Sequence, residues 1–535
     1  MANEKNYILA TLDAETDPFV YYRIPEAFCW GLYTGKNYYE KWGDDSTDQI
    51  IELILSLPEK HLIYAHNGGK FDFMYLLKKG VLSDPIKIIN GRIVSARIGI
   101  HEIRDSYAIL PMPLAGYKKD EFDYELMERE VREDNKKDIL HYLASDCENL
   151  YELVEGFINE FGLNLTIGST SIKKIKEFHP FEIQNDTHDE IYRPYYFGGR
   201  VQCFDRGLKE GVYKSLDVNS MYPHVMANYQ HPTGNEYTIL YDTDIPESFY
   251  IDGILPGYED KPYFIDFDGT NKNALPVRTP KGLDFECEAG NFKTLSHELK
   301  IGLEYNLIEI DSINEIRIPK ETINFGLFVL TYIKDKIEAK RSGDKIKEIL
   351  TKFLLNSGYG KFGQNPENFF DYHIRYPGEK CPDLDIWRLD IDYGFMELWK
   401  APAPKPIYYD VAIAASITSA ARSVLLEALC NATNPQYCDT DSIICESINN
   451  VEMDRFKLGA WDTEATGDQL YLAGKKLYAL FDSGNPVKYA SKGVRLTPDQ
   501  IKKVSMGESI NWKNEAPSFN ISGEAKFINR TIKRR

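Results

Sequence analysis

The stretch YCDTDS, residues 437–442, places Asp439 and Asp441 two positions apart in an otherwise apolar segment. A strand, turn, strand arrangement puts both carboxylates at a tight bend, where like charges repel each other. A divalent cation would relieve that repulsion, and Mg²⁺ is usually held by one or two carboxylates together with substrate phosphates. Because aspartate is also a common turn residue, this stretch alone leaves both a metal site and an ordinary turn open.

A third carboxylate, Asp217, ends the apolar run of SLDVNSMYP, and Tyr222 follows at the start of a new element. The carboxyl end of a strand is where sheet proteins commonly place ligands, so Asp217 is a second candidate for a metal or phosphate site. The alternative is an Asx turn or a helix N-cap, which needs no ligand.

The segment around KFLLNSGYGKF has the spacing of an amphipathic helix. One stripe of that helix would carry, at spacings of seven, four and three positions, a set of polar side chains: Lys345, Lys352, Asn356 and Tyr359. Lysines can neutralise a triphosphate, and a phenol ring can stack on a base. A solvated charged face is the alternative.

In chain order, DxxSMYP, KxxxNSxYG and YxDTDS resemble the three polymerase motifs of family B DNA polymerases, and KKLYAL resembles the family's KxY motif. The resemblance implies that Asp217, Asp439 and Asp441 hold two Mg²⁺ (or Mn²⁺) ions, which bridge the primer hydroxyl and the incoming phosphates. It also implies a nucleotide-binding set: Tyr222, Lys345, Lys352, Asn356, Tyr359, Lys476 and Tyr478.

The N-terminal part of the chain carries a second set of carboxylates. Asp13 and Glu15 in TLDAET are two positions apart on a predicted strand, so they face one side. Asp72 follows the glycine turn of AHNGGKFDF, and Tyr142 and Asp146 in YLASD share one face of a helix. Each group is ordinary alone, but together they resemble the three motifs of a DEDD-type 3′–5′ exonuclease with an RNase H-like fold.

The exonuclease resemblance implies a role for each of these residues. Two metal ions would be bound by Asp13, Glu15, Asp72 and Asp146, and Tyr142 would orient the attacking water. The frayed 3′ end of DNA would be held by Thr16, His66, Asn67 and Phe71. The second motif has two glycines where close relatives often carry one residue fewer, a departure that bears on His66 rather than on Asp72.

Two shorter motifs resemble the protein-primed branch of the family, found in phages and linear plasmids. YYFGGR, with Tyr196, Gly198 and Gly199, resembles the YxGG element that links exonuclease and polymerase and contacts the template. TSAAR, which ends at Arg422, resembles another DNA-binding motif of that branch. Long intervals between the polymerase motifs match the two insertions of this branch, and the first would contact a terminal (priming) protein.

Composition limits the other possibilities. The formal net charge of −19 argues against a generally basic nucleic-acid surface, although residues 334–361 carry eight basic and four acidic side chains. The eight cysteines form no CxxC pair, which favours a reducing, cytoplasmic compartment. No signal peptide is recognised, and polar residues interrupt the apolar segment 411–429, so we expect a buried helix and no membrane contact. The protein is expected to be a monomer.

The mix of strand-like and helical patterns predicts an α/β fold. The resemblance implies an α/β (α+β polymerase) architecture, with an exonuclease domain followed by palm, fingers and thumb. The predicted parts are an RNase H-like domain at 1–165, a linker and YxGG region at 166–195, palm and fingers at 196–480 with insertions at about 235–320 and 363–406, and a thumb at 481–535. The second insertion should be an extended β-hairpin, with YHIRY and DIWRLDIDY flanking PGEK.

The function that the resemblance implies is DNA-directed DNA synthesis from a terminal-protein primer, with proofreading and with strand displacement. Its partners would be template, primer and dNTPs. Two alternatives stay open. The same polymerase core could start chains on a nucleic-acid primer, or on none. A nuclease or nucleic-acid-binding protein with an inactive polymerase site is disfavoured, because the three polymerase aspartates and Lys352 are all present.

Overall fold

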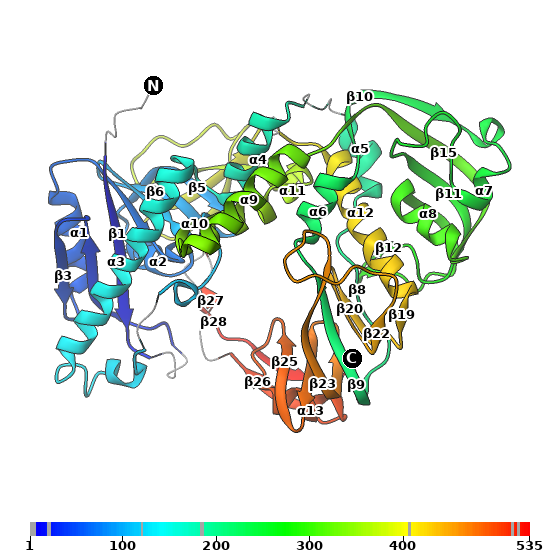
Figure 1. Cartoon of the computed structure of the whole chain (residues 1–535). Helices are drawn as coiled ribbons and strands as arrows, with labels where there is room; N and C mark the ends of the chain where they lie inside the picture. The colour runs from blue at the N-terminus through cyan, green and yellow to red at the C-terminus, as the bar shows by residue number, and fades with distance from the viewer. Residues whose placement is uncertain are drawn as a thin grey trace.

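The computed structural model describes residues 7–18, 23–118, 121–181, 184, 187–404, 408–514, 518–519, 521 and 525–534. Three large sheets are arranged around a pair of central helices (Figure 1). The N-terminal sheet lies on one side of the helices, and the palm sheet and a smaller inserted sheet lie on the other. The C-terminal strands lie below the gap between the two sides in this view.

The N-terminal sheet is mixed, with β4 parallel to both of its neighbours, β1 and β7, and the other pairs antiparallel. Its strands are β1 (Ile8–Thr16), β2 (Ala27–Tyr33), β3 (Tyr38–Trp42), β4 (His61–Ala65), β5 (Leu82–Ile89), β6 (Arg92–Ile98) and β7 (His101–Asp105). Its helices are α1 (Ser46–Ser56), α2 (Asp72–Lys78) and α3 (Lys136–Phe161). Alternating apolar residues such as Leu12, Ile63 and Ile103 build its core.

The second insertion extends this N-terminal sheet, and its pairing differs from the predicted hairpin. β16 (Phe370–Arg375) pairs with β18 (Glu397–Pro402), and β17 (Arg388–Asp392) pairs with the outer side of β18. The other edge of β16 joins β5, so the sheet has ten strands. Ile374 and Leu398 are buried in the N-terminal core, which accounts for the alternative pairing: β16 and β18 gain a core that a free hairpin lacks.

The predicted linker at 166–195 contains two packed helices, α4 (Ile167–Phe178) and α5 (His188–Tyr192). Ile172 and Ile175 are buried against the central helices, and the Ser171 hydroxyl donates to the Leu354 carbonyl at 2.6 Å. This segment is therefore part of the polymerase core, because its apolar residues recur at helical spacing despite a polar composition.

The central helices form the predicted hairpin: α9 (Gly326–Ser342) and α10 (Lys345–Ser357). Gly343 takes the left-handed conformation between them, and the Asp344 carboxylate caps α10 by accepting from the Lys347 backbone at 3.0 Å. The predicted stripe of four polar residues spans two helices, since α10 ends at Ser357 and Tyr359 begins α11 (Tyr359–Phe362).

The palm sheet has seven strands in the order β25-β24-β23-β9-β21-β20-β8. They are β8 (Val201–Cys203), β9 (Gly207–Val218), β20 (Tyr437–Asp439), β21 (Ser442–Cys445), β23 (Trp461–Gly474), β24 (Leu477–Asp482) and β25 (Asn485–Ser491), with β19 (Ala432–Thr433) and β22 (Ser447–Ile448) beside them. Two helices pack on the palm: α6 (Met221–Asn228) and α12 (Val411–Cys430). By length and composition α12 could cross a membrane, but most of it is buried inside the protein.

The predicted boundary at 480 falls inside β24, and β25 continues the palm sheet beyond it. After β25 come α13 (Pro498–Ser505) and four short strands: β26 (Ile510–Lys513), β27 (Ser518–Phe519), β28 (Ala525–Lys526) and β29 (Asn529–Ile532). Ile501 and Val504 of α13 pack on Phe481, so this C-terminal region is built directly on the palm sheet.

The first insertion has a sheet and a core of its own. Its four-stranded sheet has the order β10-β15-β11-β14. The elements are β10 (His231–Leu240), α7 (Phe249–Asp252), β11 (Phe264–Asn271), β12 (Val277–Thr279), β13 (Gly282–Asp284), β14 (Ala289–Leu295), α8 (Ser296–Glu304) and β15 (Ile308–Ile323). Phe267, Leu299 and Ile316 are central to its core.

Candidate active sites

The structure gathers the four N-terminal carboxylates, here called the N-terminal site: Asp13, Glu15, Asp72 and Asp146. Asp13 and Glu15 project from β1, and Asp146 reaches them from α3. Ligand atoms of these three residues lie within 4.8 Å of one another. Such a cluster of acidic oxygens suits a hard divalent cation.

Asp72, the first residue of α2, completes the N-terminal site, and its charge acts on Asp13. Its side chain is almost fully buried, and its Oδ1 has no hydrogen-bond partner within the described part of the chain. Burial raises the pKa of Asp72 to about 7 and, with the charges of Glu15, Asp72 and Asp146, raises that of Asp13 well above its usual range. A buried carboxylate oxygen without a partner, beside further carboxylates, fits a bound metal ion.

Tyr142 lies one helical turn before Asp146 on α3 and faces the same cavity. Its hydroxyl is 3.0 Å from that of Tyr124, and its ring stacks on Phe122 with centroids 4.6 Å apart. Burial raises the pKa of the Tyr142 phenol, so Tyr142 is a neutral donor at physiological pH. These contacts hold the hydroxyl in a defined position beside the carboxylates.

A cavity of about 990 Å³ opens from the N-terminal site and is lined by Thr16, His66, Asn67 and Phe71. Both ring nitrogens of His66 have protein partners: Nδ1 with the Ser106 hydroxyl at 3.0 Å and Nε2 with the Met112 carbonyl at 2.8 Å. His66 is thus held by the protein at the cavity wall.

Close packing explains why the second glycine of AHNGGKFDF, Gly69, cannot carry a side chain. A Cβ at Gly69 would lie 2.0 Å from the Ile93 carbonyl oxygen, so no side chain fits there. The turn also puts Asn67 in a left-handed conformation, where its Oδ1 accepts from Arg92 at 2.8 Å. The extra glycine therefore lets the turn pass close to β6 without displacing Asp72.

The far wall of this cavity was not predicted from the sequence motifs. It is formed by residues of the C-terminal region: Arg495, Thr497, Gln500, Ile510, Asn511, Trp512, Lys513 and Asn514. The Trp512 indole donates to the Arg495 carbonyl at 3.2 Å, which fixes the ring orientation. Only the aromatic and basic character of this otherwise unpatterned stretch could have suggested a nucleic-acid contact.

The three polymerase carboxylates, here called the palm site, meet at one end of the palm sheet. Ser442 lies opposite Asp217 in the β9–β21 pair, and the Val218 amide donates to the Asp441 carbonyl at 2.9 Å. Thr440, at the tip of the turn, has a left-handed backbone and donates to the Arg200 carbonyl at 2.7 Å. This register places Asp217 and Asp441 side by side, as the motifs predicted.

Asp439 differs from its neighbours because the protein supplies its counter-charge. The Lys476 Nζ lies 2.6 Å from both carboxylate oxygens of Asp439, and the Tyr437 hydroxyl donates to the same group at 3.2 Å. The Tyr478 ring packs 4.9 Å from that of Tyr437. In this conformation, Lys476 contacts Asp439 instead of projecting into open space where a nucleotide could meet it.

Desolvation raises the pKa of Asp217 to about 7 and that of Asp441 to about 6. The charge of Asp441 also raises the pKa of Asp217, while Lys476 opposes the rise at Asp441. Glu464 of β23 adds a further negative charge near both. Like the N-terminal site, this pair favours binding of a cation.

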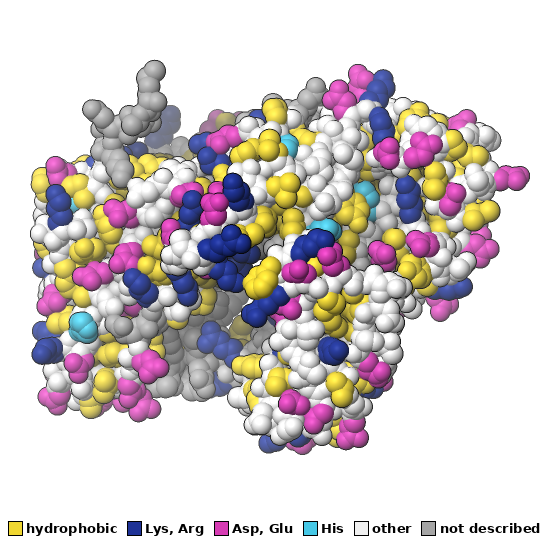
Figure 2. Space-filling view, in the orientation of Figure 1, with side chains coloured by type: hydrophobic (Ala, Val, Ile, Leu, Met, Phe, Trp, Pro, Cys, Tyr) yellow, Lys and Arg dark blue, Asp and Glu magenta, His cyan; other side chains and the backbone are white. Residues whose placement is uncertain are grey.

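Two of the predicted nucleotide-binding residues, Tyr222 on α6 and Tyr359 on α11, lie near the palm site, since burial and the nearby charge of Asp441 both raise the pKa of their phenols. The rings of Tyr222 and Tyr359 stack at 3.8 Å with an interplanar angle of 11°, joining α6 to α11. Lys345, Lys352 and Asn356 are exposed on α10. Figure 2 shows Lys and Arg side chains gathered over the middle of the molecule, where α9 and α10 lie. This is the local basic surface that the sequence predicted.

Arg422, which the sequence predicted to contact DNA, is buried inside the protein. Its side chain is only 2% exposed and forms an ion pair with Glu298 of α8 at 2.5 Å. It also donates to the carbonyls of Phe197 and Gly198 at 2.6 and 3.0 Å. Arg422 therefore supports the backbone of the YxGG segment, because its side chain is buried and bonded to Glu298 and to two carbonyls of that segment.

Comparison with known proteins gives relatives in sequence and solved structures with a similar fold. A sequence model of type B DNA polymerases, organellar and viral, matches residues 115–379. The chain is 44% identical to the DNA-directed DNA polymerase of Enterobacteria phage PRD1, over 98% of both chains. It is 25% identical to the DNA polymerase of Bacillus phage Nf, over 80% of this chain and 77% of that one.

Among solved structures, Phi29 DNA polymerase complexed with primer-template DNA and incoming nucleotides matches with a TM-score of 0.72 at 19% identity. The match covers 99% of this chain and 100% of the other. At that identity the likeness concerns the fold alone. It confirms the predicted fold class, an α/β polymerase with an exonuclease-like domain.

Proposed function

This chain belongs to the family B DNA polymerases of the phage type, and from that membership we propose that it replicates a linear phage or plasmid genome from a terminal-protein primer, with proofreading and strand displacement. DNA-directed DNA polymerase activity follows from the family. The observation that supports proofreading is the presence of two separate carboxylate sites in one chain, one on the N-terminal sheet and one on the palm sheet. Separate sites allow synthesis and removal of nucleotides by the same enzyme.

The N-terminal site supports proofreading. Asp13, Glu15, Asp72 and Asp146 would hold Mg²⁺ or Mn²⁺, and bound metal would activate water and stabilise charge on the scissile phosphate. Tyr142 has a fixed, neutral hydroxyl that can hold a water molecule by hydrogen bonding. The cavity beside it has room for an unpaired 3′ end.

The palm site supports nucleotide addition. Asp217 and Asp441 would hold the metal ions, with Asp439 kept in place by Lys476. Exposed Lys352 and Asn356 on α10 would bind the triphosphate of the incoming dNTP. The stacked ring of Tyr222 would close the space beneath the sugar, so that a ribose hydroxyl collides with it.

Priming by a protein is supported by the first insertion. It is a separate sheet with its own core, and it exposes apolar side chains: Tyr241 at 56%, Ile251 at 76% and Ile254 at 42%. Exposed apolar residues on an independent subdomain suit a protein partner. The enzyme would act as a monomer in the cytoplasm, where its eight free cysteines stay reduced.

An initiation assay tests this proposal. The enzyme, a template and a candidate terminal protein from the same genetic element would be incubated with labelled dATP. We expect a covalent adduct between the nucleotide and the priming protein, formed by the wild-type enzyme and absent with Asp441→Asn. Efficient extension of an oligonucleotide primer without any adduct would favour a nucleic-acid primer and contradict protein priming.

Strand displacement is tested by shortening the second insertion. Arg375 and Glu397 are paired across β16 and β18, so Asn-Gly can replace residues 376–396 as a two-residue turn. β16 then still covers β5 of the N-terminal sheet. We expect single-nucleotide insertion on an open template to persist and synthesis through a downstream duplex to fall about tenfold or more. Equal displacement by both enzymes would contradict a role for the insertion.

A further inference from the structure

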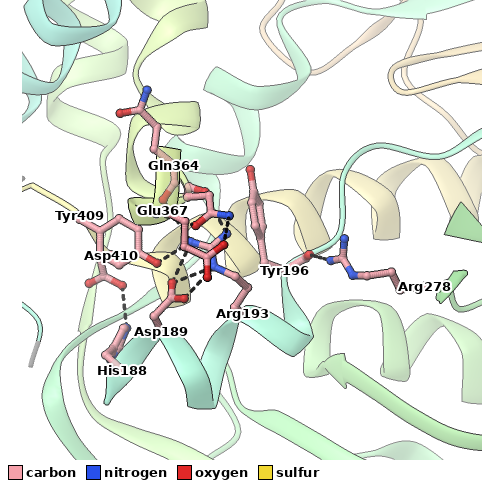
Figure 3. Close-up of polar contacts among 11 residues, drawn as sticks. His188, Asp189, Arg193, Tyr196, Arg278, Gln364, Glu367, Tyr409 and Asp410 are labelled. Atoms are coloured by element: carbon pink, nitrogen blue, oxygen red, sulfur yellow. Dashed lines mark hydrogen bonds and ion pairs between the residues drawn. The ribbon is translucent and has the colours of Figure 1, made fainter. Parts of the chain in front are cut away.

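One guanidinium, that of Arg193, joins three segments that are far apart in the sequence (Figure 3). Arg193 begins the short helix η6 (Arg193–Tyr195), and its Nε donates to the two Asp189 carboxylate oxygens at 2.8 and 2.9 Å. Its Nη1 donates to the Gly363 carbonyl at 3.3 Å, and its Nη2 to the Gln364 carbonyl at 3.1 Å. Nη2 also donates to the Tyr409 hydroxyl at 2.5 Å.

These partners lie at both ends of the second insertion. Gly363 and Gln364 are at its start, and Tyr409 follows its end. The next residue, Asp410, is also fixed: it accepts from the Ile413 amide at 3.0 Å as the cap of α12, and its other oxygen accepts from Gln184 at 2.6 Å. Both ends of the insertion are thus anchored to the segment that contains α5 and η6.

The same segment leads directly into the YxGG residues, Tyr196–Arg200, here called the template loop. The Tyr196 amide donates to the Arg193 carbonyl at 3.0 Å. A Cβ at Gly363 would lie 2.7 Å from the Tyr196 ring, so the ring packs directly on the start of the insertion. On its other side, Arg278 of the first insertion donates to the Tyr196 carbonyl at 2.7 Å.

The geometry requires an arginine. The planar guanidinium presents five donors in a rigid fork, so one side chain can bind a carboxylate, two carbonyls and a hydroxyl at once. A lysine ammonium has three donors on a flexible stem and cannot bridge the same set. The contacts run without interruption from the template loop through Arg193 to both ends of the insertion.

We propose that Arg193 is a positioning residue that couples the template loop to the second insertion, so that binding of the template strand fixes the insertion over the DNA. The proposal rests on the proposed function and on the expectation from the sequence that the YxGG segment contacts the template. Arg193 itself is 25% exposed, is bound to protein groups, and lies outside both carboxylate sites. Its loss should weaken the coupling and leave the chemistry of nucleotide addition intact.

Hydrogen exchange with and without primer-template DNA tests the coupling. In the wild-type protein, we expect DNA to slow amide exchange in the template loop and in residues 363–369 and 408–411. In Arg193→Ala the slowing should persist in the loop and disappear at both ends of the insertion, and Arg193→Lys should restore it only in part. Tyr409→Phe, which removes a single contact, is the milder variant if Arg193→Ala folds poorly.

Arg278→Ala is the matched control, because Arg278 contacts the loop but not the second insertion. It should leave the slowing at 363–369 unchanged. In kinetic assays, Arg193→Ala should keep kcat for single insertion on an open primer and lose synthesis through a duplex. A parallel loss of thermal stability, kcat and displacement would show a merely structural role and overturn the proposal.

The outcomes also separate this inference from the function on which it rests. Protection of the loop without protection of the insertion in the wild-type protein would overturn the coupling alone. Protection of the palm without the loop would contradict the template contact, and the coupling with it. A wild-type enzyme that fails to displace a strand contradicts the proposed function, while the exchange comparison still decides the coupling.

Discussion

The N-terminal site and the palm site both bring carboxylates together, but they differ in how the repulsion between these charges is offset. The N-terminal site brings three carboxylates within 4.8 Å and adds Asp72 with an unsatisfied oxygen. The palm site instead holds one of its three carboxylates, Asp439, on the lysine of the KxY motif. Because the Lys476 ammonium neutralises Asp439, the palm site needs less metal binding to hold its carboxylates together. Asp217 and Asp441 then stay available to bind the metal ions at the reacting groups.

The cavities differ as well. The N-terminal site lies in a cavity of about 990 Å³ whose far wall comes from residues 495–514. The palm site lies at one end of the palm sheet, and Lys352 and Asn356 are exposed on α10. A walled cavity suits a single unpaired strand, whereas an open face suits a duplex and an incoming nucleotide. Four predictions test this contrast, beginning with the largest expected effect.

Asp441→Asn should lower nucleotide addition by about 10³-fold or more and leave degradation of single strands unchanged. The substitution removes a metal ligand worth several kcal/mol, and about 1.36 kcal/mol corresponds to each factor of ten. Asp13→Ala combined with Glu15→Ala should do the reverse and raise misincorporation. Gel assays of primer extension and of 3′ degradation measure both activities. Loss of both activities in a folded variant would contradict independent sites.

Tyr222→Val should raise ribonucleotide insertion about tenfold or more. The substitution removes the ring that stacks on Tyr359 at 3.8 Å and opens space beneath the sugar, and steric selection of this kind is worth a few kcal/mol. The ratio of kcat/KM for dNTP and NTP measures the effect, and exonuclease activity should not change. Tyr222→Phe, which keeps the ring, is the control. Unchanged discrimination in Tyr222→Val would reject the assignment.

Much of both sites could be predicted because their geometry is local. Alternation along β1 fixes Asp13 and Glu15 on one face, one helical turn joins Tyr142 to Asp146, and a tight turn places Asp441. The pairing of Tyr372 with Ile86 could not be predicted, because nothing in either strand specifies its neighbour. The same holds for the buried role of Arg422, which depends on Glu298 in another subdomain.

Mg²⁺ affinity should fall as the pH is lowered from 8 to 6, because carboxylates must lose their protons to bind metal. Asp72 and Asp217 have pKa values of about 7, so each should weaken affinity about tenfold over this range. The N-terminal site should respond more steeply, because burial and three carboxylate neighbours raise the pKa of a second metal-binding residue, Asp13, well above its usual range. Calorimetric Mg²⁺ titrations at the two pH values measure this.

The two sites can be titrated separately. Asp441→Asn leaves the N-terminal site as the intact one, and Asp13→Ala with Glu15→Ala leaves the palm site. In the metal-free protein these carboxyl groups bind protons that the unfolded chain does not, so their contribution to stability falls as the pH rises through about 7. Mg²⁺ should reverse that loss. Equal pH dependence in the two variants would contradict the electrostatic contrast.

The smallest effect concerns the cavity wall. Trp512 is fixed by its hydrogen bond to the Arg495 carbonyl and lines the cavity that holds Asp13 and Asp146. A base stacked on an aromatic ring gains about 1–3 kcal/mol, and the low end suits a ring that is half-buried by protein. Trp512→Ala should therefore raise KM for single-strand degradation about fivefold, with kcat and single-nucleotide insertion nearly unchanged. Trp512→Phe should recover most of the loss, since it keeps a stacking surface.

Trp512 also packs on the C-terminal core. Thermal unfolding of each variant therefore distinguishes the loss of a stacking surface from unfolding of the C-terminal region. Wild-type KM in a folded Trp512→Ala variant would show that the C-terminal region closes the cavity without holding the strand.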